Sequence, residues 1–298
     1  MILSVSRRTD IPAFYMEWFC RRLREGEAYS ANPMNPHQIS RIQMNPENMD
    51  GIVFWSKNPE PMLSHLSELN SFPYYIQYTC NAYGQDTEPG LPSLARRLDT
   101  FFRLSEALGA KRVIWRYDPV FLSRKYSVQW HLEQFEQLAE KLEGITEQCV
   151  FSFLDYYRNT GKRMETLGLR SLNKEEMNIL AAGFSAFAEK RGMRLCTCAE
   201  RLDLSAYRIS HGKCVDSRLL EEISGRKAAA GKDRNQRPEC GCDASVDIGV
   251  YRTCSHGCLY CYASGSRKTL EANLSRYREN SPVLCRGLTE RDVIKDRA

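Results

Sequence analysis

The sequence predicts an α/β fold in which a parallel sheet forms a (β/α) barrel, complete or partial, followed by a C-terminal cysteine-rich extension. Two observations carry this prediction. Short apolar segments alternate with amphipathic segments along most of the chain, and the cysteines concentrate in its last third. Repeated strand–helix alternation favours parallel strands joined by right-handed crossovers. An open doubly wound sheet is the alternative, although no G-x-G-x-x-G sequence follows a strand to indicate a dinucleotide site.

Six segments have the length and composition of buried strands, since they are short, apolar and mostly rich in β-branched or aromatic residues. They are residues 2–6, 51–55, 74–79, 112–115, 150–154 and 193–197. Residues 38–43 and the stretch near Ile209 are candidates for two further strands. Six to eight strand–helix units in this length of chain fit a (β/α) barrel.

Amphipathic spacing predicts helices between these strands. One helix begins at Pro12, and two others have apolar faces that include Leu98 and Leu138. A further helix begins after Asn173, which is followed three residues later by Glu176. This pair is a variant of the capping box, in which each side chain accepts a hydrogen bond from the backbone of the other residue.

The composition changes near residue 226, and we divide the chain there. Residues 1–225 are expected to form the barrel, and residues 226–298 a basic connector and a cysteine-rich iron–sulfur module packed on it. The connector carries Arg226, Lys227, Lys232, Arg234 and Arg237. Such a charge run is usually solvated surface.

The overall composition is that of a globular protein. The chain has 298 residues, 42% of them apolar and 27% charged, with a net charge of +5. These values exclude an intrinsically disordered protein, which has few aromatic residues and a large net charge. No apolar run approaches the roughly 18 residues of a membrane span, and the N-terminus lacks the pattern of a secretory signal. We therefore expect a cytoplasmic protein without a membrane partner.

Charged or amide side chains closely follow nearly every predicted strand. The candidates for catalysis are Arg7, Asp10, Lys57, Arg116, Asp118, Asp155 and Glu200. Arg8 and Asn58 are candidates for cofactor binding. In a barrel the carboxyl ends of the strands meet at one face, which is where active sites of this fold lie. Such a face suits an anionic or strongly polar ligand. The alternative is that strand ends are polar in any protein because loops are solvated.

Cys254, Cys258 and Cys261 form a C-x3-C-x2-C motif. In a reducing compartment, clustered cysteines indicate metal binding before disulfides. Iron–sulfur clusters usually have four cysteine ligands, so three thiolates around a 4Fe–4S cluster leave one iron open. The motif resembles the cysteine loop of radical S-adenosylmethionine (SAM) enzymes, including the aromatic Tyr260. The resemblance implies that the open iron binds SAM, that Tyr260 contributes to cofactor binding, and that a reduced cluster cleaves SAM to a 5′-deoxyadenosyl radical.

Other metal arrangements remain open. Cys242 could close the cluster as a fourth ligand, or Cys240 and Cys242 could complete a zinc site, although their C-x-C spacing is tighter than in the usual zinc knuckle. Cys198 and Cys214 could join Cys240 and Cys242 in a second metal site. We expect His256, inside the loop, to support the ligands rather than bind metal.

Ordered motifs along the whole chain resemble the uncharacterised microbial family known as domain of unknown function 1848. They include S-R-R-T-D-I-P-A-F-Y (6–15), V-F-W-S-K-N-P (53–59), W-R-Y-D-P (115–119), T-C-A-E (197–200) and H-G-K-C-V-D (211–216), followed by the cysteine-rich stretch 240–263. The resemblance implies a C-terminal cysteine cluster like that of radical SAM enzymes, and no established reaction. Unlike ordinary radical SAM enzymes, the cysteine loop follows nearly all the strands, and a Gly-Gly-Glu element is absent from the sequence.

The leading functional hypothesis is a radical-SAM-like enzyme that acts on a small-molecule or nucleotide-like substrate. It would receive electrons from a donor such as a ferredoxin or flavodoxin. One alternative is a SAM-independent iron–sulfur protein that transfers electrons or binds nucleic acid, although a net charge of +5 is small for a nucleic-acid domain. The other is a structural zinc protein whose polar face does hydrolytic chemistry.

Overall fold

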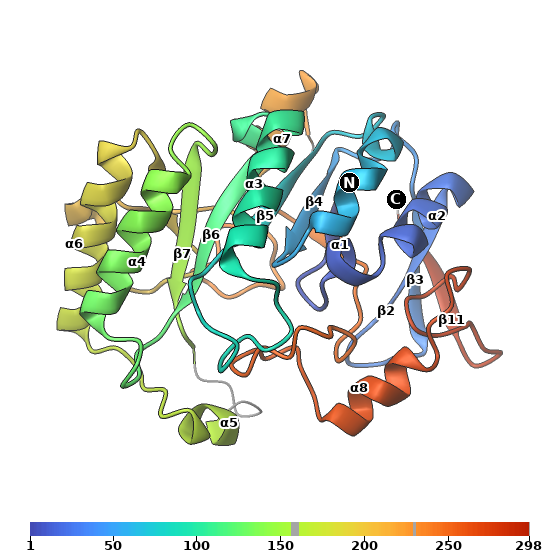
Figure 1. Cartoon of the computed structure of the whole chain (residues 1–298). Helices are drawn as coiled ribbons and strands as arrows, with labels where there is room; N and C mark the ends of the chain where they lie inside the picture. Colours follow the sequence, from blue (N-terminus) through green and yellow to red (C-terminus); the bar gives the residue numbers. More distant parts are fainter. Residues whose placement is uncertain (156–160, 229–230, 298) are drawn as a thin grey trace.

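The fold is built around a parallel eight-stranded sheet (Figure 1). The computed structural model describes residues 1–155, 161–228 and 231–297. The strands of the sheet are β1 (Ile2–Val5), β4 (Gly51–Ser56), β5 (Tyr74–Thr79), β6 (Val113–Val120), β7 (Gln148–Phe153), β8 (Arg194–Thr197), β9 (Ser210–His211) and β10 (Ser245–Asp247). Their order is β10-β1-β4-β5-β6-β7-β8-β9, and all neighbouring pairs are parallel. The predicted α/β fold with a large parallel sheet is confirmed.

The two edges of this sheet, β9 and β10, are not paired with each other as strands within the described residues. The strand pairing of the described residues therefore does not close the sheet into a barrel. The segments beside these edges nonetheless touch, because the backbone N–H of Asp243, before β10, donates to the carbonyl of Val215, after β9, at 2.9 Å. This contact joins the two segments that lie next to the opposite edges of the sheet.

Both faces of the sheet are buried. One face carries side chains such as Phe54, Trp115 and Phe151, which lie in the main core. Figure 1 shows helices α3 (Leu94–Leu108), α4 (Val128–Lys141) and α6 (Lys174–Lys190) lying side by side over the sheet. The opposite face carries Val53 and Ile114 in a second core cluster with Leu220 of α7 (Ser217–Ser224). Parallel strands buried on both faces explain the continuous apolar runs of the sequence.

A second, smaller sheet has the order β11-β3-β2. It consists of β2 (Glu27–Ala31), β3 (Gln38–Gln43) and β11 (Val293–Arg297). Residues 38–43 therefore form a strand as expected, but outside the main sheet. The stretch near Ile209 leads into β9 of the main sheet. Neither β2 nor β11 was predicted, since both lack a continuous apolar run, and all residues of β11 are exposed.

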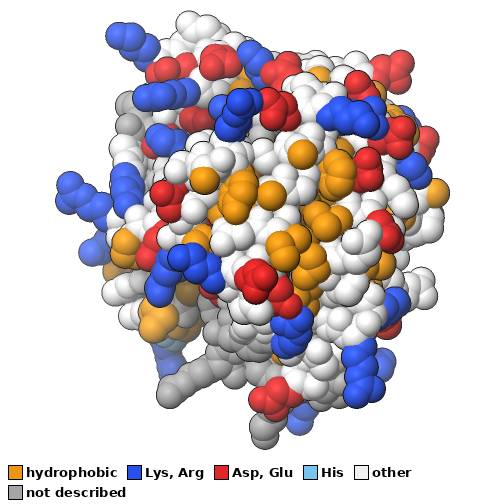
Figure 2. Space-filling view, turned by 90° about the vertical axis from the view of Figure 1, so that its left-hand side faces the viewer, with side chains coloured by type: hydrophobic (Ala, Val, Ile, Leu, Met, Phe, Trp, Pro, Cys, Tyr) orange, Lys and Arg blue, Asp and Glu red, His pale blue; other side chains and the backbone are white. Residues whose placement is uncertain are grey.

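The remaining helices are short. They are α1 (Ile11–Phe14), α2 (Met16–Glu25), α5 (Gly161–Thr166) and α8 (Arg267–Leu274), with the 3-10 helices η1 (Glu60–Leu69), η2 (Ala110–Arg112) and η3 (Ser205–Tyr207). The predicted capping box of α6 is confirmed, because Asn173 and Glu176 exchange side-chain-to-backbone hydrogen bonds of 2.9 Å. Across the described chain, no helix has the length and apolar character needed to cross a membrane. On the α6 side of the molecule, apolar side chains gather in a patch framed by charged groups (Figure 2).

His131 of α4 is a buried titratable group of the core. Its Nε2 lies 2.7 Å from the carbonyl oxygen of Phe121, and its Nδ1 lies 2.9 Å from the hydroxyl of Tyr117. A neutral imidazole satisfies both contacts, donating from Nε2 and accepting at Nδ1. Burial lowers the pKa of His131 to about 4.

This pKa predicts an acid-sensitive fold. Between pH 6.5 and 4 the unfolded chain binds a proton at His131 that the folded chain does not, so stability falls as the pH falls through this range. We expect the free energy of unfolding to decrease by about 2 kcal/mol more between pH 7 and pH 5 in the wild type than in His131→Gln, measured by urea denaturation. Equal pH dependence in the two proteins would contradict the assignment.

Candidate functional site

The carboxylate of Asp10 joins three segments at the carboxyl edge of the sheet. It caps α1 by accepting a hydrogen bond from the backbone N–H of Ala13 at 3.0 Å. It also accepts from Ser56 Oγ at 2.7 Å and from the backbone N–H of Lys57 at 2.8 Å, at the end of β4. Finally, His256 Nε2 in the cysteine loop lies 2.8 Å from Asp10 Oδ2. Burial raises the pKa of Asp10, but His256 and the hydrogen bonds from Lys57 and Ser56 together outweigh burial, so the net shift is downward.

A second buried ion pair lies beside this network. Lys57 Nζ is 2.8 Å from Oε1 of Glu88, which follows β5. The hydroxyl of Tyr260, in the cysteine loop, donates to the same oxygen. Burial lowers the pKa of Lys57, but the Glu88 carboxylate together with Cys258 and Asp118 outweighs burial, and the net shift is upward. Both groups are therefore charged near neutral pH.

Backbone contacts hold the cysteine loop against the segment after β5. The N–H of Gly90 donates to the carbonyl of His256 at 2.9 Å, and the N–H of Leu259 donates to the carbonyl of Thr87 at 3.1 Å. A Cβ atom on Gly90 would lie 2.7 Å from the oxygen of His256, so only glycine permits this approach. Figure 1 shows the orange-red C-terminal part of the chain running along this edge of the sheet.

The three thiols of the predicted motif lie close enough to influence one another. Burial raises the pKa of Cys254 to about 12, with further contributions from Asp10 and Cys261. Burial also raises the pKa of Cys258, and the Cys254 and Cys261 thiols contribute in the same direction. Arg163 of α5 donates to the carbonyl of Cys261 at 3.2 Å. A metal cation would hold such thiols in the deprotonated form.

Trp55 lies within cation–π distance of two arginines. The guanidinium carbon of Arg116 is 5.1 Å from the ring centroid and that of Arg7 is 5.6 Å from it. Arg116 is 3% exposed, and its Nη2 pairs with Oδ2 of Asp118 at 2.8 Å. Ser152 Oγ donates to the other oxygen of Asp118. Burial raises the pKa of Asp118, but Arg116, Ser152 and Lys57 together outweigh burial and the net shift is downward.

Asp247 of β10 fixes the end of β1. Its carboxylate accepts from Ser4 Oγ at 3.0 Å, from Ser6 Oγ at 2.6 Å and from the backbone N–H of Arg7 at 2.8 Å. Arg8 lies 3.8 Å from the same carboxylate. The C-terminal segment thus positions the first arginine pair of the sequence.

The structure brings most of the predicted site residues together. Arg7, Asp10, Lys57, Arg116, Asp118, Tyr260 and the three loop cysteines belong to the contacts above. Asn58 follows Lys57, and its N–H donates to Ser56 Oγ at 3.0 Å. Cys198, Cys214, Cys240 and Cys242 form a separate group of thiols, described below.

Two predicted catalytic residues lie apart from these contacts. Asp155 has an exposed side chain and pairs with Arg237 of the connector. Glu200 accepts from the backbone N–H of Arg201 at 2.9 Å and of Leu202 at 3.4 Å, and so stabilises a local turn. These two contacts explain the positions of the Asp155 and Glu200 carboxylates without a bound ligand.

Three important residues were missed by the sequence analysis. Trp55 shares a face with Val53 and Lys57, which alternation along the strand could have indicated. Asp247 lies in the cysteine-rich stretch that carries the family resemblance, but nothing local indicates a partner in the first strand. Glu88 lies nine residues after the end of β5, too far for its proximity to Lys57 to be deduced.

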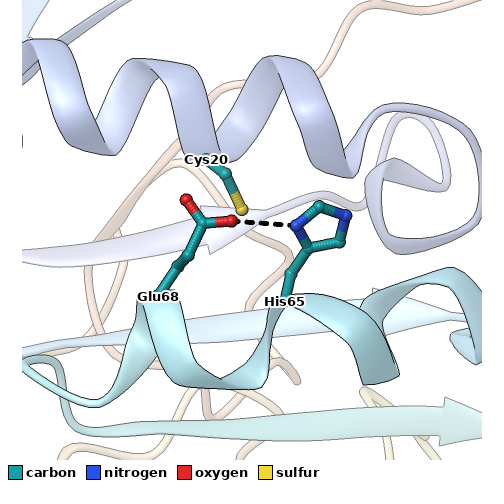
Figure 3. Close-up of side chains that lie close together, drawn as sticks. All are labelled: Cys20, His65 and Glu68. Carbon is teal, nitrogen blue, oxygen red and sulfur yellow. Dashed lines mark hydrogen bonds and ion pairs between the residues drawn. The ribbon is translucent and has the colours of Figure 1, made fainter.

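A further group of ligand-type side chains lies between α2 and η1. Cys20, His65 and Glu68 have ligand atoms within 4.8 Å of one another (Figure 3). His65 Nδ1 contacts Glu68 Oε1 at 2.9 Å, and Arg24 occupies the other oxygen of Glu68. Burial raises the pKa of Cys20 to about 12. Since the protein already satisfies these groups, we assign no metal to them.

Comparison with known families identifies the chain. The model of a family described as a domain of unknown function (DUF1848) matches residues 2–263. The chain belongs to this family. The DUF1848 match begins at β1 and ends just after Cys261, so it includes every contact of the candidate site described above. Comparisons with curated proteins and with solved structures return no match.

Removing the Asp10 carboxylate should loosen the site. Asp10→Ala leaves the buried His256 without its partner, and we expect the free energy of unfolding to fall by about 3 kcal/mol. Amide hydrogen exchange should accelerate in residues 254–261. The matched control is Asp99→Ala, which breaks an exposed pair with Arg103 and should cost at most about 1 kcal/mol. Similar losses in both variants would argue against a central role for Asp10.

Proposed function

We propose that this protein is a radical-SAM-like iron–sulfur enzyme in which Cys254, Cys258 and Cys261 bind three irons of a 4Fe–4S cluster. The observation that carries the proposal is the contact of the cysteine loop with the polar carboxyl edge of the sheet, through the Asp10–His256 and Glu88–Tyr260 contacts. When bound, the cluster and SAM would supply a 5′-deoxyadenosyl radical. The substrate is expected to be polar or anionic.

Unpaired polar atoms at this edge support a bound ligand. Thr9 Oγ1, Trp55 Nε1, Asn58 Oδ1 and Glu88 Oε2 are buried, and within the described part of the chain none has a hydrogen-bond partner. Buried polar atoms are rarely left unsatisfied. SAM carries an ammonium group, a carboxylate and hydroxyls, so the oxygens of Asn58 and Glu88 can accept from it and Trp55 Nε1 can donate to it.

The surrounding side chains suit a reduced, negatively charged cluster. The Lys57 ammonium lies close enough to Cys258 for their charges to interact, and its positive charge offsets that of thiolates. Aromatic rings cover the loop on one side, since Tyr260 lies 5.5 Å from Phe121 and 6.3 Å from Tyr83 between ring centroids. Such a shell limits solvent access, which affects both reduction potential and side reactions.

The proposal predicts a cluster signal that responds to SAM. Anaerobically reconstituted and reduced protein should give an electron paramagnetic resonance signal that changes when SAM is added, and should form 5′-deoxyadenosine. The variant Cys254→Ala/Cys258→Ala/Cys261→Ala should lose both, with 5′-deoxyadenosine reduced by at least about 100-fold, on the scale of losing an essential catalytic group.

The matched control is Cys285→Ala, which removes a buried thiol beside Tyr15 and should retain the signal. A cluster signal that ignores SAM in the wild type would instead favour a SAM-independent electron-transfer protein. Stoichiometric zinc bound by the three loop cysteines would exclude the radical enzyme.

A further inference from the structure

Four cysteines outside the C-x3-C-x2-C loop converge between the two edges of the sheet. Cys198 follows β8, Cys214 follows β9, and Cys240 and Cys242 precede β10. Because β9 and β10 are opposite edges of the sheet, the cysteines come from segments far apart in the strand order. The backbone N–H of Val215 donates to Cys242 Sγ at 3.4 Å, which joins the two edges directly at a thiol.

The four sulfurs form a continuous row. Cys214 Sγ lies 3.1 Å from Cys198 Sγ. Cys214 also makes a side-chain hydrogen bond with Cys242, which makes another with Cys240. All four are free thiols, and all but Cys198 are fully buried. A single buried cysteine such as Cys149 is enough to fill space in the core. Packing alone therefore does not explain why four thiols lie side by side.

Positive charge surrounds this row. Arg116 Nη1 donates to Cys214 Sγ at 3.0 Å. Arg7 lies close enough to Cys242 and Cys214 for their charges to interact. A buried guanidinium is stabilised by anionic partners, and a neutral thiol is only a weak acceptor. Thiolates bound to a metal would therefore add to the anionic partners that the two arginines already have in Asp118 and Asp247.

The backbone around the row is held by a second layer of buried groups. The hydroxyl of Tyr75 and Nε2 of Gln77 both donate to the carbonyl of Cys214, at 2.9 and 3.0 Å. A Cβ atom on Gly212 would lie 2.6 Å from Cys196 Sγ, and one on Gly241 would lie 3.1 Å from the oxygen of Gly212. The absence of a side chain at Gly212 makes room for Cys196, and the absence of one at Gly241 allows a close approach of the two cysteine-bearing segments. Metal ligands are typically oriented by such outer contacts.

We propose that Cys198, Cys214, Cys240 and Cys242 bind a second metal centre with four thiolate ligands. It is separate from the loop cysteines and does not depend on the function proposed for them. Both zinc and iron–sulfur clusters accept four cysteines. No three of the four sulfurs lie mutually within 4.8 Å, whereas tetrahedral zinc holds its sulfurs about 3.8 Å apart. An iron–sulfur cluster, whose cysteines bind different irons, tolerates the wider spacing.

Metal analysis of anaerobically purified full-length protein tests the second centre. Iron, sulfide and zinc are measured per chain in the wild type, in the triple loop variant defined above, and in Cys198→Ser/Cys214→Ser. We expect each multiple variant to lose one centre and keep the other, so that two iron–sulfur clusters would fall from about eight irons to about four. One zinc retained in the loop variant and lost in the double variant would support the same four ligands with zinc. Cys196→Ala, on the same strand but outside the row, should keep the full metal content.

A second measurement uses only the wild-type protein, so its result does not depend on whether a variant folds. Iodoacetamide labelling of the four cysteines is followed by mass spectrometry, without metal removal and after removal of metal by EDTA and ferricyanide followed by reduction of the oxidised cysteines to free thiols. Labelling should rise at least tenfold when metal is removed. Unchanged labelling, or a double variant that keeps all wild-type metal, would overturn the second centre. Loss of the SAM response with the second centre intact would overturn only the function proposed for the loop.

Discussion

The buried carboxylate of Asp10 is the constraint on which the site depends. One side chain caps α1, binds the end of β4 and contacts His256 of the cysteine loop. A buried carboxylate is costly unless its oxygens are fully hydrogen-bonded. The three segments therefore have to meet, because separating any one of them leaves polar groups buried and unpaired. In this way the fold of residues near the N-terminus determines where a loop near residue 256 lies.

Charge balance links the two cysteine groups. Lys57 lies beside the loop thiols, whereas Arg7 and Arg116 lie beside the row of four. The two arginines also share the ring of Trp55. The carboxylates of Glu88, Asp118 and Asp247 partly neutralise these cations, and the cysteine thiols lie beside the same cations. The carboxyl edge of the sheet is thus an arrangement of buried cations around thiols, rather than a generic polar rim.

Much of this fold could be predicted from local sequence. The central strands and α3, α4 and α6 follow from apolar periodicity, because each buries a continuous face. The strands β2, β10 and β11 could not be predicted, since their residues are polar and their pairing depends on distant segments. The same limit applies to the site. Strand-end position identified Asp10, Lys57 and Arg116, whereas Glu88 and Asp247 act through contacts that span most of the chain. Asp155 and Glu200 satisfied the same rule, yet Asp155 pairs with Arg237 of the connector and Glu200 with the adjacent backbone, apart from the contacts of the site.

The position of β10 beside β1 has a consequence for how the molecule is made. The first strand of the chain is flanked by β4 and by β10, which begins 240 residues after β1 ends. Until residues 245–247 leave the ribosome, β1 has an open edge, and open edges can pair with other chains. The segments that carry Cys240, Cys242 and the three loop cysteines are also synthesised late. The region around these thiols is therefore completed late in synthesis, and a prematurely terminated chain contains the helical layer but not the C-terminal cysteines.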